Sequence, residues 1–186
     1  KKFRFTITTN GLLLDDDKID FINKEMSNVV LSVDGRKSVN DYMRIRVDGS
    51  GCYDKIMPAF KKLVSLRGDK EYYVRGTFTK NNLDFADDVF DLYNNGFDQI
   101  SVEPVVCEAT EDYAITEKEL PAIFKEYENL AERILENERK GGKFNFFHFM
   151  LDLDQGPCAI KRLRGCGCGN DYVAVTPDGD IYPCHQ

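Results

Sequence analysis

Cysteine thiols gather in the last part of the chain. The sequence holds six cysteines, and four of them, Cys158, Cys166, Cys168 and Cys184, follow residue 157 among Gly, Pro and Asp residues. Thiolates bind soft metal ions and iron–sulfur clusters, and backbone N–H groups in tight turns can hydrogen-bond to the sulfurs. A disulfide scaffold would spread its cysteines over a much shorter chain. We therefore expect these four cysteines to bind metal.

The spacing of the four cysteines leaves two kinds of metal site open. Seven, one and fifteen residues separate them in order along the chain. A structural zinc site is usually signalled by two Cys-x-x-Cys pairs, or by one such pair with paired histidines, and neither pattern is present. We prefer an iron–sulfur cluster as the hypothesis. A non-catalytic zinc-binding scaffold module on an α/β domain is the alternative.

Two charges lie inside apolar segments, Arg75 within residues 71–78 and Glu103 at the end of residues 99–103. A charge in such a place must be paired or must face a polar cavity. A structural ion pair between the two and a polar cavity that holds a cationic ligand are equal alternatives. The lone cysteines Cys52 and Cys107 are interpreted as small buried residues without an assigned role.

The elements that must position these groups alternate along the chain. Strands are predicted at residues 3–9, 29–33, 71–78 and 99–103, and helices at 16–26, 53–66 and 83–93. Three of the strands are short and almost continuously apolar, as parallel strands covered on both faces are. The alternation predicts right-handed βαβ crossovers and a parallel sheet, hence an α/β fold.

A longer helix is predicted from Thr116, whose side chain caps it while Glu119 reaches back, to the glycines at 141 and 142. The apolar run 144–151 is predicted as the next strand, with Phe144, Phe146 and Phe149 in the core and His148 a hydrogen-bonded core residue. From residue 152 the composition changes to Gly, Cys, Pro and Asp. We place a domain boundary there, giving domains 1–151 and 152–186.

The second domain contains the pattern of a small β-hairpin. Residues 172–176 and 181–182 are β-formers that flank the turn Pro177-Asp-Gly179.

Composition excludes several classes of function. Charged residues make up 31% of the chain and the net charge is −7, so a phosphate-binding basic surface is not expected and nucleic acid is not a predicted partner. The apolar runs are far shorter than the roughly 20 residues that cross a bilayer, and no signal peptide is recognisable. We expect a cytoplasmic protein without a membrane partner.

The end of the chain resembles a known cluster-binding domain. The segment Gly179-Asp-Ile-Tyr-Pro-Cys184, with Cys166 or Cys168 upstream, resembles the SPASM domain of radical S-adenosylmethionine enzymes. The segments 147–152, 156–158, 165–167 and 172–186 are similar to the maturases of six-cysteine (SCIFF-type) peptides, clostridial enzymes that install thioether cross-links. The resemblance implies that Cys158, Cys166 and Cys184 bind an auxiliary [4Fe-4S] cluster, and it leaves Cys168 open.

The earlier residues carry matching motifs. Thr8-Thr-Asn-Gly11 resembles the third-strand Thr-Asn-Gly of the family, and Leu31-Ser-Val-Asp-Gly35 its fourth-strand Ser-x-Asp-Gly. Asn40-Asp-Tyr-Met-Arg44 is similar to the family's His-Asp-x-x-Arg, with Asn at the first position. The resemblance implies the later strands of a partial radical S-adenosylmethionine (β/α) barrel, followed by the start of a SPASM-type domain.

The resemblance also implies roles for cofactor-binding residues. Ser32 would contact the ribose or amino-acid part of S-adenosylmethionine, Arg44 would bind its carboxylate, and Asp34, Arg75 and Glu103 would complete the cofactor-binding set. Considered without the family, Ser32 could satisfy a backbone group, Asp34 could shape the Asp-Gly turn, and Arg44 could be a surface cation.

By resemblance, the cysteines of the catalytic [4Fe-4S] cluster would precede Lys1, so we expect an incomplete enzyme that is inactive by itself. The implied reaction reduces S-adenosylmethionine to a 5′-deoxyadenosyl radical, which abstracts hydrogen from a ribosomally made, cysteine-rich precursor peptide. Ferredoxin or flavodoxin would donate the electron. A different βα-barrel enzyme, with Glu103 as acid and Arg75 as substrate anchor, is a further alternative.

Overall fold

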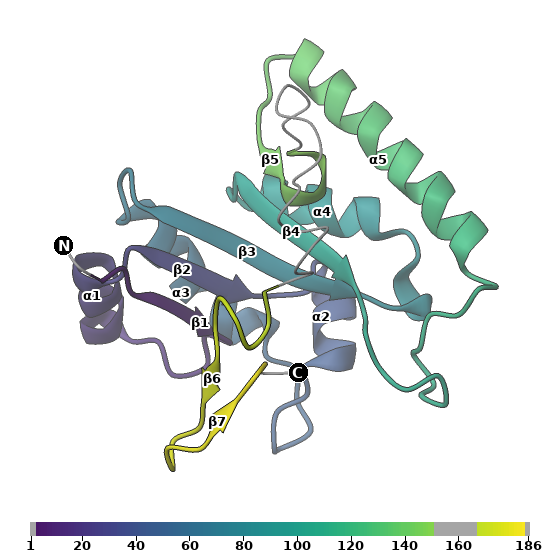
Figure 1. Ribbon diagram of the computed structural model, residues 1–186. Helices are drawn as coiled ribbons and strands as arrows, with labels where there is room; N and C mark the ends of the chain where they lie inside the picture. The colour runs from purple at the N-terminus through teal and green to yellow at the C-terminus, as the bar shows by residue number, and fades with distance from the viewer. Residues whose placement is uncertain (1–2, 151–166, 185–186) are drawn as a thin grey trace. The chain divides into compact units, whose positions relative to one another are not determined.

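Five parallel strands form the sheet of the computed structural model, in the order β1-β2-β3-β4-β5 (Figure 1). The structure describes residues 3–150 and 167–184. The chain divides into two units, Lys1–Met150 with the sheet and Leu151–Gln186 with a hairpin. The strands are β1 (Thr6–Thr9), β2 (Asn28–Ser32), β3 (Glu71–Phe78), β4 (Gln99–Pro104) and β5 (Asn145–Phe146). The predicted α/β fold with a parallel sheet is confirmed.

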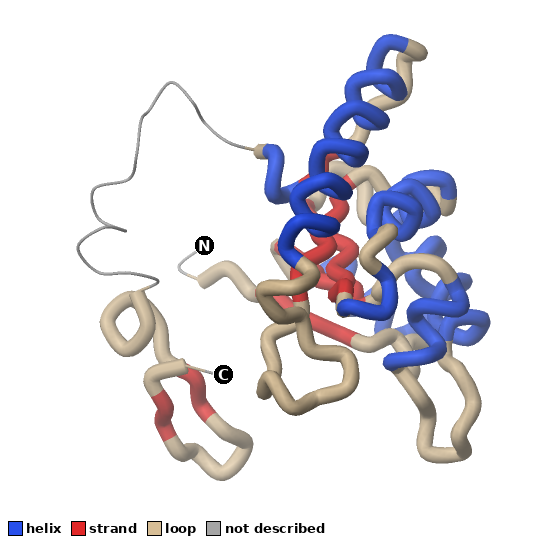
Figure 2. The backbone as a smooth tube through the Cα atoms, turned by 90° about the vertical axis from the view of Figure 1, so that its right-hand side faces the viewer, coloured by secondary structure: helices blue, strands red, loops and turns tan. Residues whose placement is uncertain are grey.

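Helices connect successive strands, as right-handed crossovers require. They are α1 (Asp16–Glu25), α2 (Lys37–Met43), α3 (Tyr53–Ser65), α4 (Phe85–Asn94) and α5 (Leu120–Arg139), with the short 3-10 turns η1 (Lys80–Asn82) and η2 (Phe147–Phe149). Helices α1, α3 and α4 cover one face of the sheet (Figure 2). Between them and the strands lies the core, where Phe60, Phe78 and Phe85 are fully buried.

The opposite face of the sheet carries half-exposed, mainly polar side chains. Burial alternates along β3, and its buried residues face the helices. Along β2, Val29 and Leu31 are buried whereas Val30 and Ser32 are only partly covered. The prediction that both faces are covered is therefore wrong for the described residues, because apolar β-branched residues such as Val30 also occupy the open face.

One helix was missed, and two predicted elements differ markedly in extent. Helix α2 was not predicted, because its seven residues are too few to show a helical apolar period. Helix α5 begins at Leu120 instead of Thr116, although Glu119 Oε2 does accept the Thr116 backbone N–H at 2.8 Å. The predicted strand 144–151 reaches only Phe146 before it turns, and Phe149 is 40% exposed, so it is not a core residue.

Among the described residues, β1 lies first in the strand order of the sheet and pairs with β2. It was predicted as a buried strand, but its residues are exposed or half-exposed here, and Phe3 and Phe5 before it are exposed. Its apolar composition could not distinguish an edge from a central position, since both use the same β-formers.

The second unit contains the predicted hairpin. Strands β6 (Ala174–Val175) and β7 (Ile181–Tyr182) pair antiparallel. Gly179, at φ 93°, donates its N–H to the Thr176 carbonyl across the turn. The positive φ is a conformation that glycine adopts without steric cost. In the part of the chain that the structure describes, none of the helices is both long and apolar enough to span a bilayer.

Candidate functional site

The loop after β2 is held by an ion pair between Asp34 and Arg44. Arg44 donates from Nε to Asp34 Oδ2 at 2.7 Å and from Nη2 to Oδ1 at 2.8 Å. The Asp34 side chain is 4% exposed and that of Arg44 is 29% exposed. Such a two-point contact fixes the guanidinium plane as well as its distance. Arg44 is thus tied to the β2 loop, and it is not the isolated surface cation considered above.

Asp34 also connects β2 to β3. Its Oδ1 accepts the backbone N–H of Thr77 at 3.0 Å, just before β3 ends. Between them, Gly76 lies so close to the β2 loop that a Cβ there would be 2.7 Å from the Val33 carbonyl oxygen. The carboxyl ends of the two strands are therefore joined by a buried carboxylate and by direct backbone approach.

Helix α2 and the start of α3 are anchored to the same loop. Asn40 is fully buried, accepts the Asp34 N–H on its Oδ1, and donates from Nδ2 to the Cys52 sulfur. Asp41 Oδ1 accepts the backbone N–H groups of Cys52 and Tyr53, each at 2.8 Å. Backbone N–H groups at the start of a helix have no partner within the helix, and Asp41 supplies one here. Cys52 is buried, as expected for a small apolar residue.

A second charged cluster joins the β2 loop to α4. Arg36 donates from Nε to Asp88 Oδ1 at 2.8 Å and from both terminal nitrogens to Asp84. These contacts raise the pKa of Arg36 and hold that of Asp84 below its usual range. Burial raises the pKa of Asp88 despite its hydrogen bonds from Arg36 and Asn82. This cluster was not predicted, although Asp88 amid the apolar residues of helix 83–93 was a visible signal.

On the open face of the sheet, Arg75 and Glu103 form an ion pair. Arg75 Nη2 lies 2.7 Å from Glu103 Oε2, and Ser101 donates to Glu103 Oε1 at 3.0 Å. Burial raises the pKa of Glu103, but the hydrogen bonds from Arg75 and Ser101 outweigh it, so the pKa is lowered. With Val30, Tyr73 and Phe147, these three residues line a pocket of about 300 Å³.

Ser32 lies next to this pair in the sheet. The register aligns Ser32 with Arg75 and Arg75 with Ser101, so the three occupy one row across β2, β3 and β4. Residues on one row of a parallel sheet share a face. The structure thus brings Ser32, Arg75 and Glu103 together on the open face. Asp34 and Arg44 lie in the loops that follow β2 and α2.

A histidine and a tyrosine meet at the edge of the sheet beyond β4. Tyr127 Oη lies 2.9 Å from His148 Nδ1. His148 is hydrogen-bonded as predicted, although it is half-exposed and does not lie in the core. Burial, and then the charge of Glu103, raise the pKa of Tyr127.

Two of the predicted cluster ligands lie in the described part of the hairpin unit. The Cys168 sulfur is 3.3 Å from the Pro183 carbonyl oxygen, which precedes Cys184, and Tyr172 Oη is 3.9 Å from the Cys184 sulfur. Cys158 and Cys166 lie outside the described residues. Within residues 3–150 and 167–184, no three His, Cys, Asp or Glu side chains are placed to hold a metal ion. The four-cysteine site remains a prediction.

Comparison with known proteins adds relatives and structural neighbours. No family model matches the chain. It is 28% identical over 191 aligned positions to an uncharacterized protein of Archaeoglobus fulgidus, covering 99% of this chain and 44% of that protein. It is 23% identical over 187 positions to a cysteine-type anaerobic sulfatase-maturating enzyme of Clostridium novyi, covering 97% and 49%.

Solved structures share the fold. Native anSMEcpe with bound AdoMet superposes with a TM-score of 0.72 at 21% identity, covering 96% of this chain and 50% of that one. Streptococcus suis SuiB bound to S-adenosylmethionine gives a TM-score of 0.64 at 17% identity, covering 97% and 42%. The chain therefore shares the fold of about half of each of these two proteins, and it spans about half the length of the relatives it matches.

Proposed function

We propose that this chain is part of a radical S-adenosylmethionine enzyme that modifies a peptide. The proposal rests mainly on the open face of the sheet, where Arg75 and Glu103 line a pocket and Ser32 is the register partner of Arg75. A parallel sheet presents its functional groups at the carboxyl ends of its strands. The fold shared with AdoMet-bound structures and a sulfatase-maturating relative support the same function.

The open face supplies groups suited to a polar, charged cofactor. Ser32 offers a hydroxyl, and Arg75 uses one terminal nitrogen for Glu103 while its planar group has further donors for a carboxylate. Glu103, kept ionised by Arg75 and Ser101, offers a negative charge to a cationic sulfonium. Asp34 and Arg44 are engaged with each other, which favours a role for both in positioning the loop that follows Ser32.

The cysteines fit iron–sulfur ligation. Cys168 lies between two glycines, and the N–H of Gly169 and the thiol of Cys168 both contact the carbonyl of Pro183, the residue before Cys184. In the proposal, Cys158, Cys166 and Cys184, with Cys168 as a further candidate, hold an auxiliary [4Fe-4S] cluster. When bound, such clusters exchange single electrons and accept thiolate ligands. A second, catalytic [4Fe-4S] cluster would be held by residues outside this chain.

The finer proposal concerns the product. We infer a thioether link from a cysteine sulfur to an α-carbon of a ribosomally made six-cysteine precursor peptide. Its basis is the resemblance of residues 147–152, 156–158, 165–167 and 172–186 to SCIFF maturases. Ferredoxin or flavodoxin is the proposed electron donor. The solved complex of anSMEcpe with AdoMet and the Kp18Cys peptide supports a peptide substrate in general, without supporting this product.

Anaerobic purification of the full-length protein tests the assignment. We expect a brown protein with iron and sulfide and an absorbance in the visible range that falls in Cys184→Ser, with Cys107→Ser, at a cysteine of similar exposure, as the control. A colourless protein that contains zinc would support the scaffold alternative instead. Mass spectrometry of the reacted precursor peptide then tests the product, because a thioether lowers the peptide mass by two hydrogens.

A measurement of S-adenosylmethionine binding distinguishes the proposed function from the remaining alternative. A βα-barrel enzyme that uses Glu103 as an acid and Arg75 as an anchor for a small substrate would not bind S-adenosylmethionine. Equilibrium dialysis of the full-length protein with labelled S-adenosylmethionine measures this directly. Lack of binding, together with a reaction that depends on Glu103, would overturn the proposed function.

A further inference from the structure

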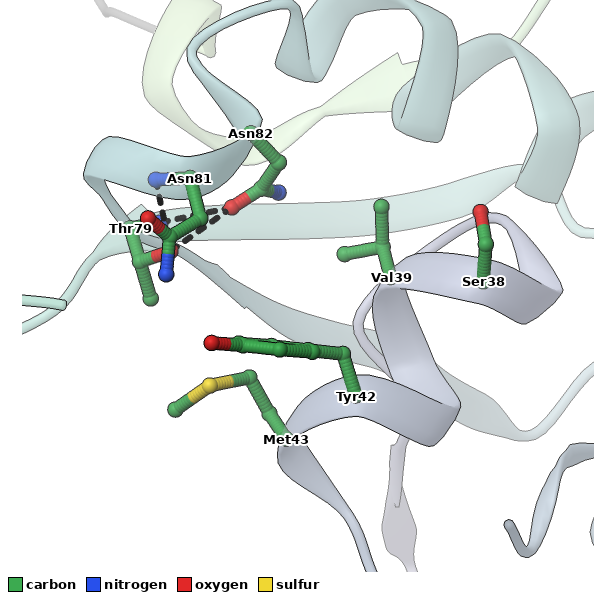
Figure 3. Close-up of a pocket in the computed structure, with 7 residues that line it drawn as sticks. All are labelled: Ser38, Val39, Tyr42, Met43, Thr79, Asn81 and Asn82. Atoms are coloured by element: carbon green, nitrogen blue, oxygen red, sulfur yellow. Dashed lines mark hydrogen bonds between the residues drawn. The ribbon is translucent and has the colours of Figure 1, made fainter.

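Two adjoining pockets share Tyr42 and Met43 at the carboxyl-end edge of the sheet. One, of about 370 Å³, lies between α2 and η1, and the other, of about 670 Å³, between the end of α2 and residues 110–113. Figure 3 shows the Tyr42 ring and the Met43 side chain extending from α2 toward Thr79 and Asn81. We call both pockets together the Tyr42 groove. Its lining includes the apolar side chains Val39, Tyr42, Met43 and Ile45 and the acidic side chains Glu111 and Asp112.

The floor of the groove is apolar and open. Tyr42 and Ile45 are each 63% exposed, although both are large apolar side chains. Val39 and Met43 continue the apolar floor along α2. Adjacent exposed apolar side chains beside a concave surface are typical of a binding site. The groove can thus bind an apolar side chain of a partner.

Most polar groups of the floor are already satisfied within the protein. Asn82 Oδ1 accepts the Thr79 backbone N–H at 2.8 Å, and its Nδ2 donates to Asp88 at 3.0 Å. Asp41 is committed to the N–H groups at the start of α3. These contacts hold the floor in place. The charged side chains of the groove that remain available to a partner lie on its far wall.

That far wall is acidic. Glu111 and Asp112 are exposed, and neither forms an ion pair within the described ranges 3–150 and 167–184. No Lys or Arg is among the described lining residues. The pKa of Tyr113 is raised, first by the charge of Glu111, in agreement with a negative potential there. Because Lys80 N–H donates to the Tyr113 carbonyl at 3.3 Å, the wall is fixed against η1.

We propose that the Tyr42 groove binds a basic segment of the peptide substrate. An apolar side chain of this segment rests on Tyr42 and Met43, while a neighbouring Lys or Arg faces Glu111 and Asp112. The inference rests on the proposed function, which supplies the peptide. The segments that line the groove come after β2, β3 and β4 in the chain. Ser32 and the end of β4 lie at this same carboxyl-end edge of the sheet. A peptide held there would lie beside the proposed reaction site.

Fluorescence anisotropy on the full-length protein tests the proposal. The probe is a short labelled peptide with two lysines beside a leucine and a phenylalanine, and the comparison peptide has glutamates for the lysines. We expect the basic peptide to bind more tightly and to weaken with added salt. The variant Glu111→Gln/Asp112→Asn should weaken it by about two- to thirtyfold, the range for removal of two exposed charge pairs.

The apolar contact has its own variants. Tyr42→Ala should weaken binding by about tenfold, whereas Tyr42→Phe should retain it, because the ring supplies the contact area. The matched control Glu128→Gln/Glu138→Gln, on exposed positions of α5, should bind as wild type does.

Equal affinity for both peptides, or equal losses in the control and groove variants, would overturn the groove proposal. Labelled S-adenosylmethionine binding is measured in parallel on the same samples. If it persists while the peptide results fail, the groove proposal alone is refuted. If it is absent in wild type, the proposed function fails first.

Discussion

The ion pair between Asp34 and Arg44 should show a measurable coupling energy, because its carboxylate is buried. Its two hydrogen bonds, at 2.7 and 2.8 Å, involve a carboxylate that is 4% exposed. Removing one partner of a buried pair costs about 3–5 kcal/mol, since the other charge is left uncompensated. Arg44 is 29% exposed, so water can partly replace it. We therefore expect about 3 kcal/mol for Arg44→Met and a coupling energy of about 2 kcal/mol.

A double-mutant cycle measures this coupling. Asp34→Asn can keep an acceptor oxygen for the Thr77 N–H, while it removes the charge and replaces the oxygen that accepts Arg44 Nε by an amide nitrogen. The variants Asp34→Asn, Arg44→Met and their combination are unfolded in urea at neutral pH and followed by far-ultraviolet circular dichroism, because this chain contains no tryptophan. The slope of free energy against urea should stay constant across the set, so that midpoints report stability.

A second cycle on the surface provides the control. Arg4 and Glu71 form an ion pair of the same 2.7 Å length, with side chains 73% and 62% exposed. Arg4→Met and Glu71→Gln should show no measurable coupling, because water screens the pair. If the buried cycle gave a coupling below about 0.5 kcal/mol, or one equal to the surface cycle, the importance assigned to burial would be wrong.

Three further predictions concern the open face and the β2 loop. Ser32→Ala should weaken S-adenosylmethionine binding by the full-length protein about tenfold in equilibrium dialysis, the usual loss for a hydrogen bond of about 1.4 kcal/mol. A change of less than twofold would remove Ser32 from the site. The lowered pKa of Glu103 means that its contribution to stability is present above the unfolded pKa and is lost as the pH falls through the folded value. Thermal midpoints measured from pH 6 to 3 should therefore fall less steeply for Glu103→Gln than for wild type, and parallel curves would contradict the assignment. Gly35→Ala places a Cβ 2.3 Å from the Asp88 side chain at φ 130°, whereas Gly49→Ala at φ 80° meets open space, so Gly35→Ala should lower the thermal midpoint several degrees further. Equal midpoints would show that α4 can move away.

The sequence predicts the sheet well because its evidence is local. Short β-branched runs at 29–33 and 71–78 alternate with amphipathic helices, and this order alone selects a parallel sheet. Coverage of the faces is not local. Val30 on the open face and Val29 on the core face are the same residue type, so composition cannot tell which of them the helices cover.

The candidate site divides in the same way. Arg75 and Glu103 could be selected from sequence because a charge is conspicuous in an apolar strand. The sequence left open whether they pair, because pairing depends on the register between β3 and β4. The contact of Arg44 with Asp34 has no sequence signature at all, since it requires α2 to turn the chain back over the β2 loop.

The cluster of Arg36, Asp84 and Asp88 makes the geometry of the β2 loop depend on α4. One cation there joins carboxylates from two positions of the helix to the loop that carries Asp34 and follows Ser32. Random mutagenesis with a screen for lost catalytic activity would therefore find inactive variants at Asp88, a residue that need not contact any substrate. Second-site variants that restore activity would be expected in the loop at 33–36 instead of at the reacting groups. Their positions would show which loop residues transmit the packing of α4 to the site.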